Sequence, residues 1–153
     1  MSTESSALFD LNRVILCHFD SYSTALVFAR WPNRSLLWPT PLPESAKQVA
    51  APAAIDAAHD GAPMLQAAID HFQVLPEDIV TMDDFNEWLD SDAGPQRVHL
   101  LRFTTFEAPA KLIAPDEGVF KPISELRGSN PTELLLLRQV FNLIIGGGDT
   151  SRR

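Results

Sequence analysis

The order of apolar and polar positions along the chain predicts a mixture of strands and helices. Short apolar runs at residues 13–19 and 24–31 flank a polar turn segment, which is the pattern of a β-hairpin. Residues 97–106 carry apolar side chains on both faces, as expected of a central strand covered by helices on each side. These segments predict an α/β (α+β) fold in which a mixed β-sheet is sandwiched between helices.

The clearest helical signal lies near the end of the chain, where residues 130–148 read NPTELLLLRQVFNLIIGGG. Asn130 is a good N-cap, Pro131 suits the first helical position, and Glu133 has the spacing of a capping box. We expect Gly146 to end the helix in the left-handed conformation. The apolar stripe of this helix is wide enough to require a sheet beneath it, and the central strand is best suited to that place.

One residue of this helix departs from the pattern. Leu135 falls in the middle of the polar side, away from the apolar stripe. Two interpretations are open. Either the helix is a plain core element, or a second copy of the chain buries Leu135 at the interface of a homodimer.

The remaining periodicities predict shorter elements. We expect helices at residues 63–72 and 83–89, and one or two helical turns within 44–51. Further short strands are expected at residues 35–38, 79–82, 111–114 and 119–123. The chain is predicted to be a single domain over residues 1–153, with flexible ends at 1–8 and 149–153 and a Pro/Ala-rich loop excursion at 39–62.

Charge and composition narrow the possible partners. The apolar content of 45% and charged content of 21% are ordinary for a globular protein. A formal net charge of −8 disfavours binding to nucleic acid or to an anionic membrane, since both need clustered Lys and Arg. The acid-rich segment 77–92 contains no base. It is interpreted as a solvated face or, alternatively, as a surface for a basic protein partner.

Cysteine usage and the N-terminal residues indicate a compartment. Cys17 is the only cysteine, so the chain cannot form an internal disulfide, and we expect a reducing environment. The first residues show no signal-peptide pattern, and no apolar run approaches the roughly 20 residues of a membrane span. The prediction is a cytoplasmic location without a membrane partner.

Few residues are candidates for chemistry. No phosphate-binding glycine loop and no GxSxG motif is present. Cys17 and His18 would point to opposite faces of a strand, and we expect Cys17 and His99 to be core residues. The candidate metal ligands are His59, Asp60, Asp70 and His71, and they would meet only if the loop folded back on the helix. The alternative is that these histidines are surface or hydrogen-bonding residues, and we expect neither a bound metal nor a cofactor.

Three segments carry a family resemblance: LLWP at residues 36–39, PEDI at 76–79 and VFKPISEL at 119–126. Their order among the predicted elements, over residues 13–145, resembles the Nudix hydrolase superfamily. The resemblance implies a Nudix-like architecture. It also implies a helix whose carboxylates hold Mg²⁺ or Mn²⁺ on a pyrophosphate.

The signature of that helix is degenerate in this chain. If the PEDI turn corresponds, the signature falls on residues 66–73, where Gln66 stands for the Arg and Ala67 for the first Glu. Asp70 and His71 stand for the paired Glu residues, so that only Asp70 retains a carboxylate. Hard divalent cations require several oxygen ligands. The resemblance therefore implies the fold without the usual hydrolysis.

Three functional hypotheses follow. The first is a non-catalytic, degenerate Nudix-like domain that binds a ligand or a partner, and this is the one we favour. The second is an enzyme, a divalent-metal-dependent hydrolase of a nucleotide-like pyrophosphate, with an atypical site near Asp70 and His71. The third is an adaptor whose acidic segment 77–92 binds a basic protein.

Overall fold

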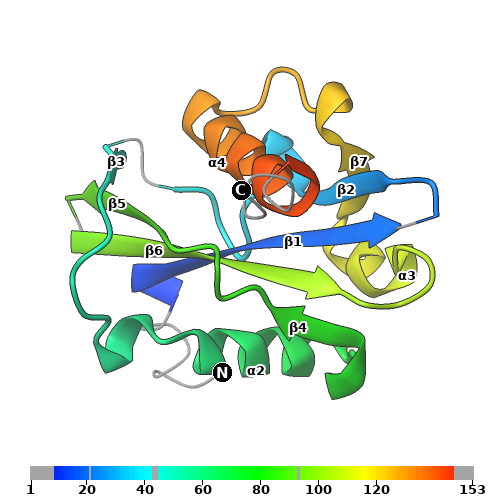
Figure 1. The fold of residues 1–153 in the computed structure, drawn as a ribbon, viewed down its shortest axis with the longest axis horizontal. Helices are drawn as coiled ribbons and strands as arrows, with labels where there is room; N and C mark the ends of the chain where they lie inside the picture. The colour runs from blue at the N-terminus through cyan, green and yellow to red at the C-terminus, as the bar shows by residue number, and fades with distance from the viewer. Residues whose placement is uncertain (1–8, 21, 43–44, 93, 147–153) are drawn as a thin grey trace.

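The computed structural model describes residues 9–20, 22–42, 45–92 and 94–146, and it places helices on both faces of a β-sheet (Figure 1). The predicted flexible ends, residues 1–8 and 149–153, lie outside the described residues. The strands are β1 (Asn12–Asp20), β2 (Ala25–Arg30), β3 (Lys47–Val49), β4 (Ile79–Thr81), β5 (Glu87–Ser91), β6 (Gly94–Phe103) and β7 (Val119–Pro122). The helices that matter below are α2 (Gly61–Phe72), α3 (Ala110–Ile113) and α4 (Pro131–Phe141).

Within the described part of the chain, the strands form a seven-stranded mixed sheet in the order β3-β5-β6-β1-β2-β7. The central strands β1 and β6 run parallel, and every other pairing is antiparallel. Strands β4 and β5 pair with successive halves of the same edge of β6. The chain between β4 and β5 therefore passes close to the middle of β6.

Successive side chains of the central strands point to opposite faces of the sheet and pack into two separate hydrophobic cores. Helix α4 and the sheet bury one core, which includes Ile15, Cys17, Val98, Leu100, Leu136, Leu137 and Val140. Helix α2 and the opposite face bury the other, which includes Val14, Leu16, Met64, Ala68, Phe72, Leu101 and Phe103. The predicted mixed sheet between helices is thus confirmed. By the same alternation, Arg97 and His99 share the face of β6 that looks towards α2.

At the N-terminus of α4, the predicted N-cap is present but the predicted capping box is not. The side chain of Asn130 accepts hydrogen bonds from the backbone N–H groups of Thr132 and Glu133, as predicted for an N-cap. The predicted capping box is wrong, because the buried carboxylate of Glu133 accepts hydrogen bonds from Leu36 and Leu42 instead. Glu133, which was predicted to make a local capping contact, therefore makes a contact with residues distant in sequence.

The end of this helix also differs from the prediction. The chain continues from α4 through a π-helical turn, Asn142–Gly146, so that Gly146 closes that turn. Residues 147 and 148, the two glycines that follow Gly146, lie outside the described residues. Phe141, an apolar residue in the last turn of α4, is exposed.

Two predicted helical segments are strands. The predicted helix at 83–89 is wrong, because residues Glu87–Ser91 pair with Gly94–Val98 as a hairpin. Gly94 adopts a φ of +111° in this hairpin, a conformation that suits glycine. The predicted helical turns within 44–51 are also wrong, because Lys47–Val49 pairs with β5. Short apolar runs fit both periodicities, and the available strand edges decide between them.

Two predicted strands take other forms. Residues 35–38 make only isolated bridges, from Trp31 to Ser35 and from Val14 to Trp38. A backbone N–H in this segment is bonded to the carboxylate on α4, which takes the place of a strand partner. Residues 111–114 belong to the short helix α3 and the turn that follows it. The predicted strands at 79–82 and 119–123 are confirmed as β4 and β7, shortened by one residue each.

Candidate functional site

A pocket of about 650 Å³ lies at the N-terminal end of α2. Its wall is formed by residues 55–57 and 60–62 together with Leu65, Thr81, Asp83 and Arg97. These residues come from the loop before α2, the first turns of α2, the end of β4 and the chain beyond it, and β6. The volume is in the range of pockets that bind small molecules.

The start of α2 leaves backbone donors available to this pocket. Asp60 is the N-cap residue, but its side chain makes no capping hydrogen bond. The first N–H groups of a helix have no partner within the helix, and the helix dipole makes this end positive. Gly61 and Ala62 supply such groups and line the pocket. An acceptor atom of a ligand would be favoured here.

Arg97 is the buried charge of the pocket. Only 7% of its surface is exposed, and its Nη1 donates a hydrogen bond of 2.9 Å to the carbonyl oxygen of His59. Its Nε is buried and has no hydrogen-bond partner among the described residues. Burial lowers the pKa of the guanidinium, and the nearby carboxylates of Asp83 and Asp60 act in the opposite direction. A buried N–H without a partner costs free energy, which an acceptor from a ligand would recover.

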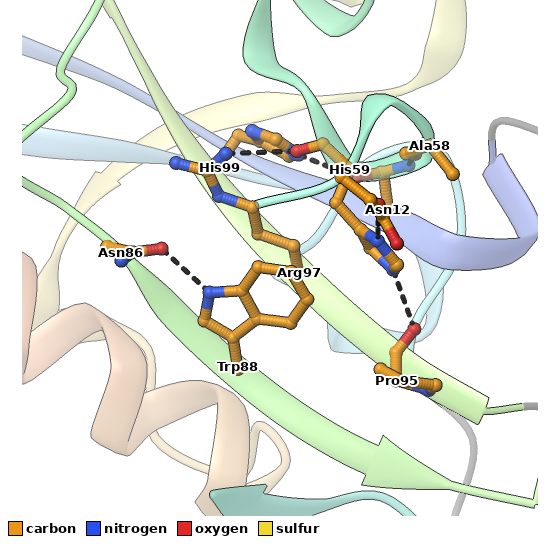
Figure 2. A network of polar contacts seen from close by, with 9 residues as sticks. Asn12, Ala58, His59, Asn86, Trp88, Pro95, Arg97 and His99 are labelled. Atoms are coloured by element: carbon orange, nitrogen blue, oxygen red, sulfur yellow. Dashed lines mark hydrogen bonds and ion pairs between the residues drawn. The ribbon is translucent and has the colours of Figure 1, made fainter. Parts of the chain in front are cut away.

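His59 anchors the loop that carries one side of the pocket (Figure 2). Its Nδ1 lies 2.7 Å from a carboxylate oxygen of Asp56, and its Nε2 lies 3.1 Å from the carbonyl oxygen of Pro95. Both neighbours are hydrogen-bond acceptors, so both ring nitrogens are engaged. The ring also packs on Trp88, with 4.7 Å between the centroids. Because both nitrogens are engaged, His59 serves as a structural anchor and not as a base.

A buried polar network holds the same loop from the other side. The side-chain amide of Asn12 donates to the carbonyl oxygen of Ala58 at 2.8 Å, and its oxygen accepts from Nε2 of His99 at 2.7 Å. Burial lowers the pKa of His99 to about 3, and the charges of Arg97 and His59 add to this effect. His99 is therefore neutral at pH 7, and it lies in the core, as the sequence predicted. Strands β1 and β6 thus fix the position of the loop against α2.

The predicted metal ligands are placed at the two ends of α2. His59 and Asp60 precede the helix, whereas Asp70 and His71 lie in its last turn, about 15 Å away for a helix of this length. His71 contacts Asp116 at 2.8 Å, and Asp70 accepts a hydrogen bond from Gln66. The structure does not bring the four residues together. Among the described residues, no group of three or more His, Cys, Asp or Glu side chains could hold a metal ion.

Cys17 and His18, the remaining candidates for chemistry, lie outside the pocket. Cys17 is fully buried in the core beneath α4, where burial raises the pKa of its thiol to about 12. Nε2 of His18 lies 2.7 Å from the carbonyl oxygen of Thr105. Cys17 and His18 were predicted to point to opposite faces of β1. Their contacts agree, because Cys17 packs in the core beneath α4 whereas His18 contacts Thr105.

The acid-rich segment 77–92 is not one helical face. Its acidic residues are spread over the turn before β4, the turn after it, and β5 with the residue beyond, and most of them are exposed. One of them, Asp83, lines the pocket beside Arg97. Binding of a basic protein through this segment stays a prediction.

Leu135 lies on the surface of α4, with 46% of its side chain exposed. If a second copy of the chain covers this residue, Leu135→Glu should give a folded monomer, because a charge cannot be buried there without a partner. Size-exclusion chromatography with light scattering measures the mass of both proteins. Arg138→Glu, an exposed change on the same helix, is the control for charge alone. An unchanged mass for Leu135→Glu would exclude this interface.

The functional residues of the pocket were not identified from the sequence. Arg97, Asp56 and Asp83 lie in three segments that only the fold brings together. One signal was available: a charged residue at the start of a strand predicted to be buried on both faces requires a partner. Arg97 is that residue, but its surroundings could not be found from the sequence alone.

Comparisons with known proteins do not assign this chain to a family. No protein-family model matches the sequence, and no curated protein is significantly similar to it. In the described part of the chain, no helix is both long enough and apolar enough to cross a membrane.

Proposed function

We propose that this protein is a non-catalytic ligand-binding domain, and that the pocket at the start of α2 binds a small molecule with a carboxylate or a similar oxyanion. One observation carries the proposal: a buried arginine lines this pocket, and its Nε has no hydrogen-bond partner among the described residues. Its Nη1 is fixed by the carbonyl oxygen of His59, so the guanidinium is held in place before a ligand arrives.

The N-terminus of α2 supports the same ligand chemistry. The amides of Gly61 and Ala62 border the pocket, and helix N-termini favour anions through both their free N–H groups and the helix dipole. A carboxylate between these amides and Arg97 would have charge-assisted hydrogen bonds from both sides.

The absence of turnover is part of the proposal. Both nitrogens of His59 are occupied, and His99 is buried, so neither is presented to a ligand as a free base. The Nudix-like resemblance would fit a domain that kept the architecture and lost the catalytic carboxylates. Its one remaining acid, Asp70, lies at the opposite end of α2 from the pocket.

The proposal is tested by a nuclear magnetic resonance titration. The panel contains short carboxylic acids, free amino acids and the carboxamide of each compound. We expect at least one carboxylate to shift the Nε–H signal of Arg97 and the amide signals of Gly61 and Ala62, while its carboxamide binds at least about tenfold more weakly. If no carboxylate moves these signals, the proposed site is wrong.

The arginine itself provides a second test. Arg97→Lys retains the positive charge but lacks the Nε donor, so we expect about tenfold weaker binding of the carboxylate found in the panel. Circular dichroism checks that the variant is folded. A nucleoside diphosphate with and without Mg²⁺ serves as the competing probe, and its metal-dependent hydrolysis would favour the enzyme hypothesis instead.

A further inference from the structure

The pocket beside Arg97 carries charges of both signs. The carboxylates of Asp56, Asp60 and Asp83 line it together with the single guanidinium. We infer that its ligand is a small zwitterion of the amino-acid type, whose carboxylate binds Arg97 and the start of α2 and whose ammonium group binds Asp60 and Asp83. This inference rests on the proposed function, since it specifies which carboxylate-bearing compound the pocket selects.

The positive group of the pocket is buried. Arg97 is more than nine-tenths buried, it lines the pocket together with the first residues of α2, and its Nε has no hydrogen-bond partner among the described residues. A carboxylate that binds this buried group loses its hydration, and it therefore needs the paired donors that Arg97 and the helix N-terminus supply.

The negative side lies at the rim. Asp60 and Asp83 are exposed, and both lie close enough to Arg97 to raise the pKa of its guanidinium. Neither appears in an ion pair among the described residues, where the ion pairs are His59–Asp56, His71–Asp116 and Lys121–Glu125. Asp56 is already engaged by His59, so the two other carboxylates are the ones available for a cation.

The charge balance distinguishes between three kinds of ligand. Three carboxylates and one guanidinium give the wall a formal charge of −2 when all four groups are ionised, which repels a simple anion. A simple cation satisfies the rim but leaves the Nε of Arg97 unpaired. A zwitterion satisfies both sides at once, and the apolar side chains of Ile55 and Leu65 leave a surface for its remaining carbon atoms.

The ligand-side experiment changes one charge at a time. The standard amino acids are screened by isothermal titration calorimetry, and the best binder is compared with its N-acetyl derivative, its carboxamide and its decarboxylated amine. We expect each of the three modified compounds to bind at least about tenfold more weakly than the free amino acid. If the N-acetyl derivative or a plain carboxylic acid binds equally well, the zwitterion is wrong and the carboxylate site stands. If no carboxylate binds, both proposals are wrong.

The protein-side experiment uses two neighbouring aspartates. Asp83→Asn removes a rim charge of the pocket, whereas Asp84→Asn makes the same change at an exposed residue that does not line it. We expect Asp83→Asn to weaken binding of the free amino acid by about tenfold and to leave its N-acetyl derivative no weaker. Asp84→Asn should bind like the natural protein. Equal affinities for the two variants would overturn the role of the rim.

Discussion

Acid should destabilise this protein by about 3 kcal/mol between pH 7 and pH 4 through His99 alone. The imidazole is 1% exposed, and burial lowers its pKa from 6.5 to about 3. The unfolded chain therefore takes up a proton at His99 below pH 6.5, whereas the folded chain does not until about pH 3. More protons bound by the unfolded state mean that stability is full above pH 6.5 and is lost as pH falls through this window.

Urea unfolding at several pH values measures this effect when the natural protein is compared with His99→Gln. Glutamine can still donate to the side-chain oxygen of Asn12, but it does not titrate. We expect the variant to lose about 3 kcal/mol less than the natural protein over the same pH range. His71→Gln is the control, because His71 is exposed and paired with Asp116 at the surface. If His99→Gln keeps the full acid dependence, His99 is not its source.

Two carboxylates with a lowered pKa titrate below the range tested. The pKa of Asp56 is lowered by its hydrogen bond to His59, and that of Asp20 by the backbone of Tyr22. Both start from 3.8, so both titrate below the range tested. Their stabilising contributions are present above pH 3.8 and are lost only as pH falls further.

The acid sensitivity of His99 bears on the pocket. His99 bonds to Asn12, and Asn12 bonds to the carbonyl oxygen of Ala58 in the loop that borders the ligand. The same loop is held by Arg97 through the carbonyl oxygen of His59. The Asn12–His99 pair and Arg97 therefore hold the same loop, at Ala58 and His59. Loss of either set of hydrogen bonds should make the start of α2 less well ordered.

The sequence predicted the parts of the fold that long, consistent patterns encode. The central strand β6 and the helices α2 and α4 follow from runs of about ten residues or more, whereas the hairpin of β1 and β2 follows from two shorter apolar runs that flank a polar turn. The faces of β6 were also predictable, because a strand with apolar side chains on both sides needs a layer on each.

Short segments were not predictable, since their form depends on what lies beside them. The segment around Trp88 has apolar residues that fit a helix, but its pairing with Arg97 and its neighbours makes it a strand. The pocket has the same origin. Arg97, Asp60 and Asp83 are separated along the chain, and only the pairing of β4 and β5 with one edge of β6 brings them to the same place.

Glu133→Ala should destabilise the protein by about 2–5 kcal/mol, because two buried backbone donors lose their acceptor. The carboxylate of Glu133 accepts from Leu36 at 2.9 Å and from Leu42 at 3.4 Å, and the side chain is 1% exposed. The segment it holds cannot replace these bonds, since it forms only isolated bridges with the sheet. Alanine leaves both N–H groups without a partner and opens a gap beneath α4.

Glu133→Gln separates the hydrogen bonds from the charge. Its amide oxygen can accept from one of the two donors, so the loss of stability should be about half that of alanine.

Burial raises the pKa of Glu133 above 4.5, whereas the hydrogen bonds from Leu36 and Leu42 lower it. In the window above pH 4.5 the folded state then binds more protons, and the natural protein loses stability from this group as pH rises. Glutamine should remove that loss, so the gap between Glu133→Gln and the natural protein should narrow from pH 4.5 upwards. Urea unfolding over this range measures the gap. A constant gap would mean that the carboxylate is ionised throughout and that its two hydrogen bonds outweigh its burial.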